Sequence, residues 1–329
     1  MKIMVVGPTD PDSFADNVIH ALTSMGHEVL AAGPARVVRG PRKMRNVSHL
    51  LLEQMARADT GSQHHLVLAA RHFRPRLVIT LDVRLRPATV RGMQLAGTSV
   101  VLWFPDHVSN LGKHEVFLCG YDRMYFKNPR LVQQLRDLHG LPAVHLPEAA
   151  NPAWHHPVGD YGTDRTIVVA GNVHPTRAIL LERLAAANIP LRIYGPPISS
   201  WLNFPRLREL HAGHAVVREE KAQTFRRARG VLNNLHPAEY AGSNCRLFEA
   251  TACGAAVLTE WREGMDSLFE AGTEVLDFET FDQLLHRCRQ VLNDRELGRT
   301  VADAAARRSS FDHTYQTRLG TMLKDLTLA

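Results

Sequence analysis

Short continuous apolar runs alternate with helix-length amphipathic segments along this chain, and that alternation most constrains its fold. In the first half, runs of strand length occupy residues 2–6, 29–32, 77–81 and 99–103. Helical patterns separate them at residues 12–25, 64–73 and 88–96, with Asp10 or Asp12 as the expected cap of the first helix. Continuous apolar strands are typical of a parallel sheet covered on both faces, so the first half predicts an open α/β sheet.

The same alternation returns in the second half. Strands are predicted at residues 166–170, 191–194, 230–235 and 255–258, and helices at 175–187, 219–229 and 243–253. The repeated order predicts two doubly wound, Rossmann-like sheets that face each other across a cleft. Ligands of such sheets bind at the carboxyl ends of the strands.

A proline-rich stretch separates the two halves. Pro142, Pro147, Pro152 and Pro157 fall within residues 141–160, and neither a helix interior nor a central strand tolerates that spacing. We therefore place the interdomain linker here. The predicted domains are residues 1–150, residues 151–310 and a closing helical segment, 311–329, that packs back on the first domain.

Composition excludes several classes of protein. The chain has 329 residues, of which 45% are hydrophobic, and no window approaches 18 uncharged apolar residues, so no transmembrane helix is expected. The first apolar run is too short for a secretory signal. The four cysteines form no CxxC motif, which favours reduced thiols and a cytoplasmic location.

The net charge of +6 suggests an anionic partner. The basic residues are scattered and no nucleic-acid-binding motif accompanies them, so a phosphate-bearing small substrate is preferred over nucleic acid. One basic stretch follows the second strand: Arg36, Arg39, Arg42, Lys43 and Arg45. A solvated loop is the preferred interpretation there, with an anionic acceptor or peripheral membrane contact as alternatives. The 18 histidines show no metal-ligand spacing, and no required metal is predicted.

The most informative segment spans residues 242–260. Gly242, Ser243 and Asn244 precede a helical run, and the exposed amides of a helix start favour phosphate. Glu249 lies in a mostly apolar stretch of that helix, where a carboxylate needs a partner. The residues alone leave two partners open: a pair of sugar hydroxyls, or a salt bridge to Arg246 or another arginine.

Other strand ends of the second half carry polar groups. Gly171 and Asn172 form a turn before a helix, and Arg177 in its first turn is interpreted as a phosphate ligand, with a helix-surface arginine as the alternative. Tyr194 ends the next strand, where a donor-site border and a simple turn are equally supported. His236 approaches the donor or is a structural histidine.

In the first half, Gly7, Pro8 and Thr9 end the first strand and form a candidate acceptor or diphosphate loop. Residues 103–107 end a later strand with two aromatic rings, an acid and an imidazole. Trp103 and Phe104 could form a sugar platform beside Asp106 and His107, which are the candidate catalytic residues. In the alternative, both rings belong to the core and Asp106 caps a turn.

Residues 249–257 resemble the donor motif of retaining GT-B glycosyltransferases, Glu-Ala-x-Ala-Cys-Gly-x-Pro-Val, with Ala256 in place of proline. Together with Asn244-x-Arg246-x-Phe248, residues 258–260, 268–275 and 313–318 are similar to the CgeB-like branch of these enzymes. The resemblance covers roughly the last hundred residues.

This resemblance implies the GT-B fold and transfer of a sugar from a nucleotide-diphosphate sugar, with a UDP-sugar favoured, to an unidentified acceptor with retention. The donor is a substrate, and no cofactor is expected. Glu249 would hold the ribose and Arg177 the diphosphate, while Asn172 replaces a familiar arginine. Ala241 occupies the place of a second glutamate, so contacts from residues 242–244 are preferred over Glu239. A sugar-nucleotide epimerase and a catalytically silent nucleotide-sugar binder remain the alternatives.

Overall fold

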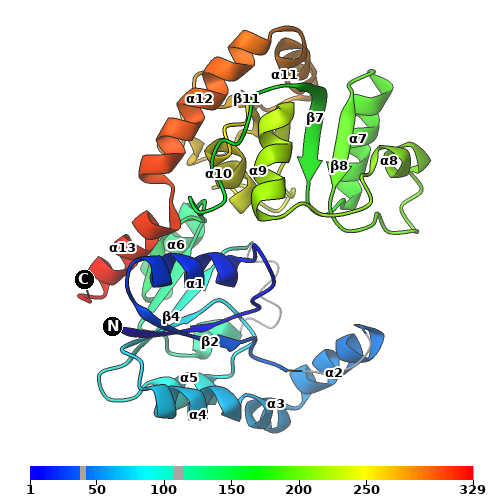
Figure 1. The fold of residues 1–329 in the computed structure, drawn as a ribbon. Helices are drawn as coiled ribbons and strands as arrows, with labels where there is room; N and C mark the ends of the chain where they lie inside the picture. The colour runs from blue at the N-terminus through cyan, green and yellow to red at the C-terminus, as the bar shows by residue number, and fades with distance from the viewer. Residues whose placement is uncertain (38–41, 107–114, 329) are drawn as a thin grey trace. The chain divides into compact units, whose positions relative to one another are not determined.

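The computed structural model describes residues 1–37, 42–106 and 115–328 (Figure 1). The chain forms two compact units. Unit 1 contains Met1–Pro147 and Leu319–Ala329, and unit 2 contains Glu148–Arg318. The chain thus passes from unit 1 to unit 2 within the proline-rich stretch, and it returns to unit 1 inside the last helix.

Unit 1 is built on a six-stranded parallel sheet in the order β2-β1-β3-β4-β5-β6. Its strands are β1 (Lys2–Val6), β2 (Glu28–Gly33), β3 (Leu77–Thr80), β4 (Ser99–Phe104), β5 (Arg123–Phe126) and β6 (Ala143–His145). The apolar residues of β1, β3 and β4 are buried because helices cover both faces, as continuous apolar runs predict. The predicted open sheet is confirmed, and β5 and β6 extend it.

The helices of unit 1 are α1 (Phe14–Ser24), α2 (Arg42–Gln54), α3 (Ala56–Ser62), α4 (His64–Phe73), α5 (Pro87–Met93), α6 (Pro129–Asp137) and the end of α13 (Tyr315–Asp325), with a 3₁₀ turn at Glu115–Leu118. The cap of α1 is Ser13, whose Oγ accepts from the Asp16 amide at 3.2 Å, so the expectation of Asp10 or Asp12 is wrong. Within unit 1, Asp325 of α13 accepts a hydrogen bond from the Tyr125 hydroxyl at 2.8 Å.

The basic stretch after β2 differs from the solvated loop that the sequence suggested. Arg36 is buried and binds both carboxylate oxygens of Asp59, at 2.7 and 2.6 Å. Arg42 begins α2, which exposes Met44, Val47, Leu50 and Leu51. Arg36 is therefore not part of a solvated loop, and Arg42, Lys43 and Arg45 lie in the helix α2; Arg39 lies outside the described residues.

Unit 2 contains a five-stranded parallel sheet in the order β11-β10-β9-β7-β8. Its strands are β7 (Asp164–Ala170), β8 (Leu191–Tyr194), β9 (Ala228–Asn233), β10 (Val257–Glu260) and β11 (Leu276–Phe278). The parallel arrangement predicted for this half is confirmed. All five strands run the same way, so their carboxyl ends lie along one edge of the sheet.

The helices of unit 2 are α7 (Pro175–Ala186), α8 (Pro205–Leu210), α9 (Arg218–Arg227), α10 (Cys245–Ala252), α11 (Phe281–Asn293) and α12 (Arg295–Asp312), with a 3₁₀ turn at Met265–Ser267 (Figure 1). Two apolar cores lie on either side of the sheet; residues of α7 and α11 contribute to one, and residues of α9 and α10 to the other. No helix in the described part of the chain is long and apolar enough to cross a membrane.

Candidate functional site

The turn after β7 is the best-defined part of the carboxyl edge of unit 2. Gly171 has a φ of 105°, and its amide donates to the Tyr194 carbonyl at 2.8 Å. A side chain on Gly195 would come within 2.5 Å of the Gly171 oxygen, so the turns after β7 and β8 pack backbone against backbone. Glycine at both positions is therefore a steric requirement, and it leaves the main chain of Gly171 unshielded by a side chain of its own.

The start of α7 supplies amides at this edge. His174 is the N-cap, and its Nδ1 accepts from the Arg177 amide at 3.3 Å and contacts Thr176 Oγ1 at 2.9 Å. Pro175 occupies the first turn, where a missing amide hydrogen costs nothing. The exposed amides and dipole of such a helix start favour an anion.

Arg177 is buried and fixes the loops around it. Its Nε donates to Asn234 Oδ1 at 2.8 Å, and Nη2 to the Asn234 carbonyl at 2.9 Å. Nη1 donates to the Asn172 carbonyl at 2.7 Å. The alternative of a helix-surface arginine is therefore wrong. Burial, followed by the charge of Arg246, lowers the pKa of Arg177 to about 9.

Arg246 brings a second guanidinium to the same edge from the first turn of α10. Its Nη1 donates to Asn233 Oδ1 at 3.3 Å, and its Nη2 lies where a side chain on Gly171 would be. Arg246 is half-buried. His236, in the loop after β9, is exposed, and its ring centroid lies 5.1 Å from that of His174.

Two carboxylates partly balance these cations. The charges of Glu239 and Glu260 both act on Arg177 and favour its protonated form. Glu260 Oε2 accepts from the Leu235 amide at 2.9 Å, and its Oε1 pairs with Arg262. Glu239 is buried. Burial first, and then the charge of Arg246, lowers the pKa of Arg177, so an additional anion at this edge would favour its protonated form.

The turn before α10 presents unsatisfied polar groups. Gly242 has a φ of 78°, and its amide donates to the Glu263 carbonyl at 2.9 Å. The N-cap of α10 is Asn244, so the helix begins later than predicted. Among the described residues, neither the Oγ of the buried Ser243 nor Asn244 Oδ1 has a hydrogen-bond partner. Buried polar groups without partners are rare and suit a ligand contact.

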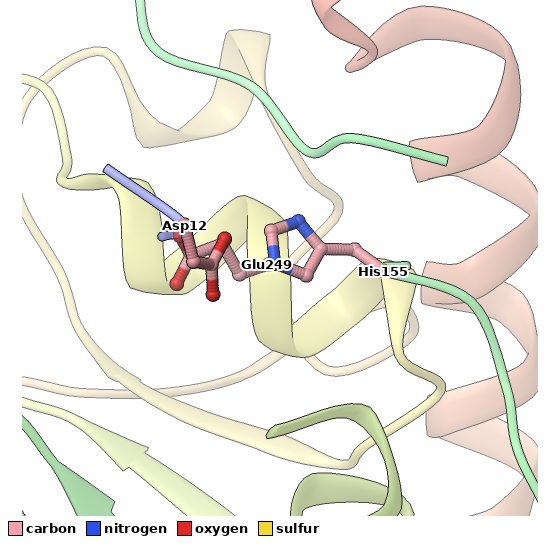
Figure 2. Close-up of side chains that lie close together, drawn as sticks. All are labelled: Asp12, His155 and Glu249. Carbon is pink, nitrogen blue, oxygen red and sulfur yellow. The ribbon is translucent and has the colours of Figure 1, made fainter. Parts of the chain in front are cut away.

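Glu249 is buried on α10 and forms an ion pair, but its partner is not an arginine. Lys221 Nζ of α9 lies 3.0 Å from Glu249 Oε2, whereas Arg246 turns to Asn233. A ring nitrogen of His155 also lies within 4.8 Å of a Glu249 carboxylate oxygen (Figure 2). The salt bridge expected with Arg246 or another arginine is thus formed with a lysine, and ribose binding by Glu249 stays a prediction.

The structure places the candidate residues of unit 1 as follows. Gly7 is buried, and a side chain there would meet the Cβ atoms of Leu81 and Ala15 at 3.2 and 3.3 Å, so close packing favours glycine at this position. Pro8 and Thr9 are exposed.

The end of β4 does not offer an aromatic surface. Trp103 and Phe104 are both buried; Trp103 Nε1 donates to the Leu146 carbonyl at 3.3 Å, and its ring packs edge-on against Phe14. The aromatic platform that the sequence suggested is therefore wrong, and the core alternative holds. Asp106 is exposed, and His107 lies outside the described residues.

Two further side chains join the carboxyl edge of unit 2. Tyr194 is half-buried, with its ring 5.7 Å from that of His214. His174, next to the second imidazole of His236, was not among the residues selected from the sequence. Pro175 marks the start of a helix, so the place of His174 directly before it could have identified this residue as the cap.

Residues 176–324 match the sequence family described as Glycosyl transferase-like. No curated protein sequence matches the chain. Among solved structures, sucrose-phosphate synthase from Thermosynechococcus elongatus is similar with a TM-score of 0.68 at 14% identity, over 99% of each chain. Anabaena HepE in complex with UDP gives 0.67 at 13% identity, over 100% of both chains.

A third structure, AviGT4, is described as a glycosyltransferase involved in avilamycin A biosynthesis. It gives a TM-score of 0.63 at 16% identity, over 99% of this chain and 97% of that one. At these identities the likeness establishes the fold. The protein has the GT-B fold, two parallel-sheet α/β units, and its residues 176–324 match a glycosyl transferase-like family.

Proposed function

We propose that this protein is a glycosyltransferase that uses a nucleotide-diphosphate sugar, with a UDP-sugar favoured, and that the diphosphate binds at the carboxyl edge of unit 2. The observation that carries the proposal is the juxtaposition of Arg246, the Gly171 turn and the N-terminus of α7. HepE, which shares the fold, has been solved with UDP and with UDP-glucose, and this supports the choice of donor.

In this proposal Arg246 and Arg177 have different roles. Arg246 donates to the diphosphate, because it is half-buried and, within the described part of the chain, its one hydrogen bond is that of Nη1 to Asn233. Arg177 holds the Asn172 and Asn234 loops in place and adds its charge to the site. Fixed donors stabilise the charge that develops on the departing diphosphate.

The remaining donor contacts are proposed from burial and hydrogen bonding. Ser243 and Asn244 bond the donor sugar, since their oxygens lack partners within the described part of the chain. Glu249 holds the ribose hydroxyls in exchange for part of its contact with Lys221. Tyr194 borders the nucleotide. Retention at the anomeric carbon rests on the sequence resemblance.

The acceptor side is proposed on unit 1. Asp106 and His107 are the candidate catalytic pair, and Gly7, Pro8 and Thr9 are the candidate acceptor or diphosphate loop. Asp106 is exposed, which suits contact with an acceptor hydroxyl. Transfer requires no cofactor and no metal in this proposal.

Nucleotide binding tests the donor site. Thermal shifts are measured with UDP, GDP, ADP and dTDP, and UDP is expected to raise the melting temperature most, because a ligand stabilises the state that binds it. Arg246→Ala should weaken UDP binding about 10- to 100-fold, as expected for a lost charge-assisted hydrogen bond. Arg289→Ala, on the exposed face of α11, is the matched control and should bind normally. If no nucleotide shifts the melting temperature, the proposal fails.

Turnover distinguishes a transferase from a silent binder. The chain is incubated with UDP-glucose in the absence of acceptor, and slow release of glucose and UDP is expected, because water replaces the acceptor. Asp106→Asn should reduce that release while leaving UDP binding unchanged. Binding without any release in the wild type would contradict a transferase and favour a nucleotide-sugar sensor.

A further inference from the structure

The helix α2 carries an apolar face that no other side chain in the described part of the chain covers. Met44, Val47 and Leu51 follow one another at spacings of three and four residues, which places them on one side of the helix. These three and their neighbours Leu50 and Met55 are each 56–64% exposed. Single exposed apolar residues are ordinary, but a group of this size on one helix marks an interaction surface.

The opposite side of α2 attaches the helix to unit 1. Glu53 follows Leu51 by two residues, which places it on the far side of the helix. Glu53 Oε1 pairs with Arg36 Nη1 at 3.3 Å, and the Glu53 carbonyl accepts from Arg86 Nη2 at 3.0 Å. The helix packs chiefly against α3, and Figure 1 shows it standing out from the rest of unit 1. The apolar face therefore points away from the body of unit 1.

The charge around this face decides what kind of surface can cover it. Residues 36–58 contain six arginines and lysines but one acid, Glu53, whose carboxylate is already paired with Arg36. A second copy of the same face would bring like charges together, which disfavours association of two copies through it. An apolar stripe with basic residues around it is complementary to a lipid surface with anionic headgroups. Three of the basic residues occupy the first four positions of α2: Arg42, Lys43 and Arg45.

We propose that this protein binds an anionic membrane surface through α2. The helix has 13 residues and is about 20 Å long, which is too short to cross a hydrocarbon core of about 30 Å. It lies along the membrane, with Met44, Val47 and Leu51 among the acyl chains and the basic residues near the headgroup phosphates. This contact belongs to unit 1 and does not depend on the donor site proposed in unit 2.

Co-sedimentation of the whole chain with lipid vesicles measures this contact. Vesicles of phosphatidylglycerol and phosphatidylcholine in equal amounts should retain the protein. Vesicles of phosphatidylcholine alone should bind it about tenfold more weakly or less, because each basic residue near an anionic surface strengthens binding roughly fivefold. Raising the salt concentration from about 0.1 M to about 0.5 M should weaken binding to the anionic vesicles, since salt screens the surface charge.

Two double variants separate the apolar face from the charge. Met44→Gln with Leu51→Gln keeps good helix formers and should weaken binding to the anionic vesicles about tenfold, because less apolar surface enters the membrane. Leu68→Gln is the matched control, since this leucine of α4 is also exposed, and it should bind as the wild type does. Lys43→Gln with Arg45→Gln should weaken binding to the anionic vesicles about 10- to 30-fold and leave binding to phosphatidylcholine unchanged.

The variants should keep the circular dichroism spectrum and the UDP binding of the wild type, because none of them alters the carboxyl edge of unit 2. Loss of UDP binding in the wild type would therefore overturn the donor site and leave the membrane contact standing. Selective retention by the anionic vesicles, reduced in both double variants but not in Leu68→Gln, supports the inference.

Three results would overturn it. The first is a wild type that stays in solution with the anionic vesicles or binds both kinds of vesicle equally. The second is undiminished vesicle binding by Met44→Gln with Leu51→Gln. The third is a wild-type dimer in sedimentation velocity that becomes a monomer in that variant, without vesicle binding, since this would assign the face to a second copy of the chain.

Discussion

Arg177 and Arg246 belong to the same edge of unit 2 but differ in how far their hydrogen bonds are already used. Arg177 is buried with three bonds to main-chain and amide oxygens, whereas Arg246 is half-buried with one. A buried guanidinium with three hydrogen bonds contributes mainly to structure, and a half-buried one with fewer hydrogen bonds is able to bind a ligand.

This difference predicts that one substitution acts mainly on stability and the other mainly on UDP binding. Arg177→Ala should lower the free energy of unfolding by about 2–4 kcal/mol, because Asn234 and the Asn172 carbonyl lose their donor. Arg246→Ala should change it by less than about 1 kcal/mol and act on UDP binding instead. Urea unfolding followed by circular dichroism measures both. Equal destabilisation by the two variants would contradict the assignment.

Glu249 raises a related question, since its salt bridge and its proposed ribose contact use the same carboxylate. Glu249→Ala removes the carboxylate that lies 3.0 Å from the buried Lys221 ammonium and should cost about 1.5–3 kcal/mol of stability. Lys221→Met with Glu249→Gln removes both charges and should restore much of that loss. If Glu249 also binds ribose, UDP affinity stays reduced in the double variant; unchanged affinity would leave Glu249 a structural role only.

At the scale of elements, the positions of strands and helices with strong local signals could be predicted from the sequence. The continuous apolar runs predicted β1, β3, β4, β7 and β8 because a fully covered parallel strand needs nothing else. The short strands β5 and β6 lack such runs, and α10 starts at Cys245 rather than Ser243 because capping depends on backbone geometry. Arg36 was misplaced because its partner Asp59 lies on a helix that the sequence did not suggest.

The packing of α12 gives a test at this scale. A side chain on Gly298 would overlap the hydroxyl of Tyr161, which donates to the Arg229 carbonyl at 2.5 Å. Gly298→Ala should therefore destabilise the protein by about 1–3 kcal/mol. Gly320→Ala, on α13, meets nothing within 4 Å and should stabilise it by about 0.5–1 kcal/mol. Thermal unfolding compares the two, and a stabilising Gly298→Ala would contradict the described contact.

For the whole molecule, pH sensitivity follows from buried histidine. His313 packs against Phe248 and Phe269, donates from Nε2 to the Leu268 carbonyl at 2.7 Å and lies 2.8 Å from an Arg318 nitrogen at Nδ1. Burial above all lowers its pKa from 6.5 to about 4. Between these two pKa values His313 is protonated in the unfolded chain but not in the folded protein. The free energy of unfolding therefore decreases as pH falls from about 7 towards 4.

His313→Gln tests this linkage. Between pH 7 and pH 5 the wild type should lose about 2 kcal/mol of unfolding free energy through His313 alone. The variant is less stable at pH 7, because glutamine fills the aromatic pocket less well, but its loss on acidification should be smaller by that amount. Urea unfolding at the two pH values provides the comparison. Parallel losses in both proteins would show that His313 is already charged in the folded state.

The two-unit architecture was the most predictable property of the molecule, since it depends on a pattern repeated along the chain. The donor edge was predictable in part: Gly171, Arg246 and residues 242–244 follow local strand-end and helix-start signals. The pairing of His174 with His236 and of Arg177 with Asn234 was not, because each contact joins segments about sixty residues apart and no local pattern encodes it.

The central claim is that unit 2 binds a nucleotide sugar at the carboxyl edge of its sheet, and hydrogen–deuterium exchange of the whole chain locates that contact. With saturating UDP-glucose, amide exchange should slow at residues 171–178 and 242–247, because ligand contacts protect these turns and helix starts. Residues 187–190, near the amino end of β8, should exchange as in the free protein. Protection at 187–190 without protection at 171–178 would contradict the account.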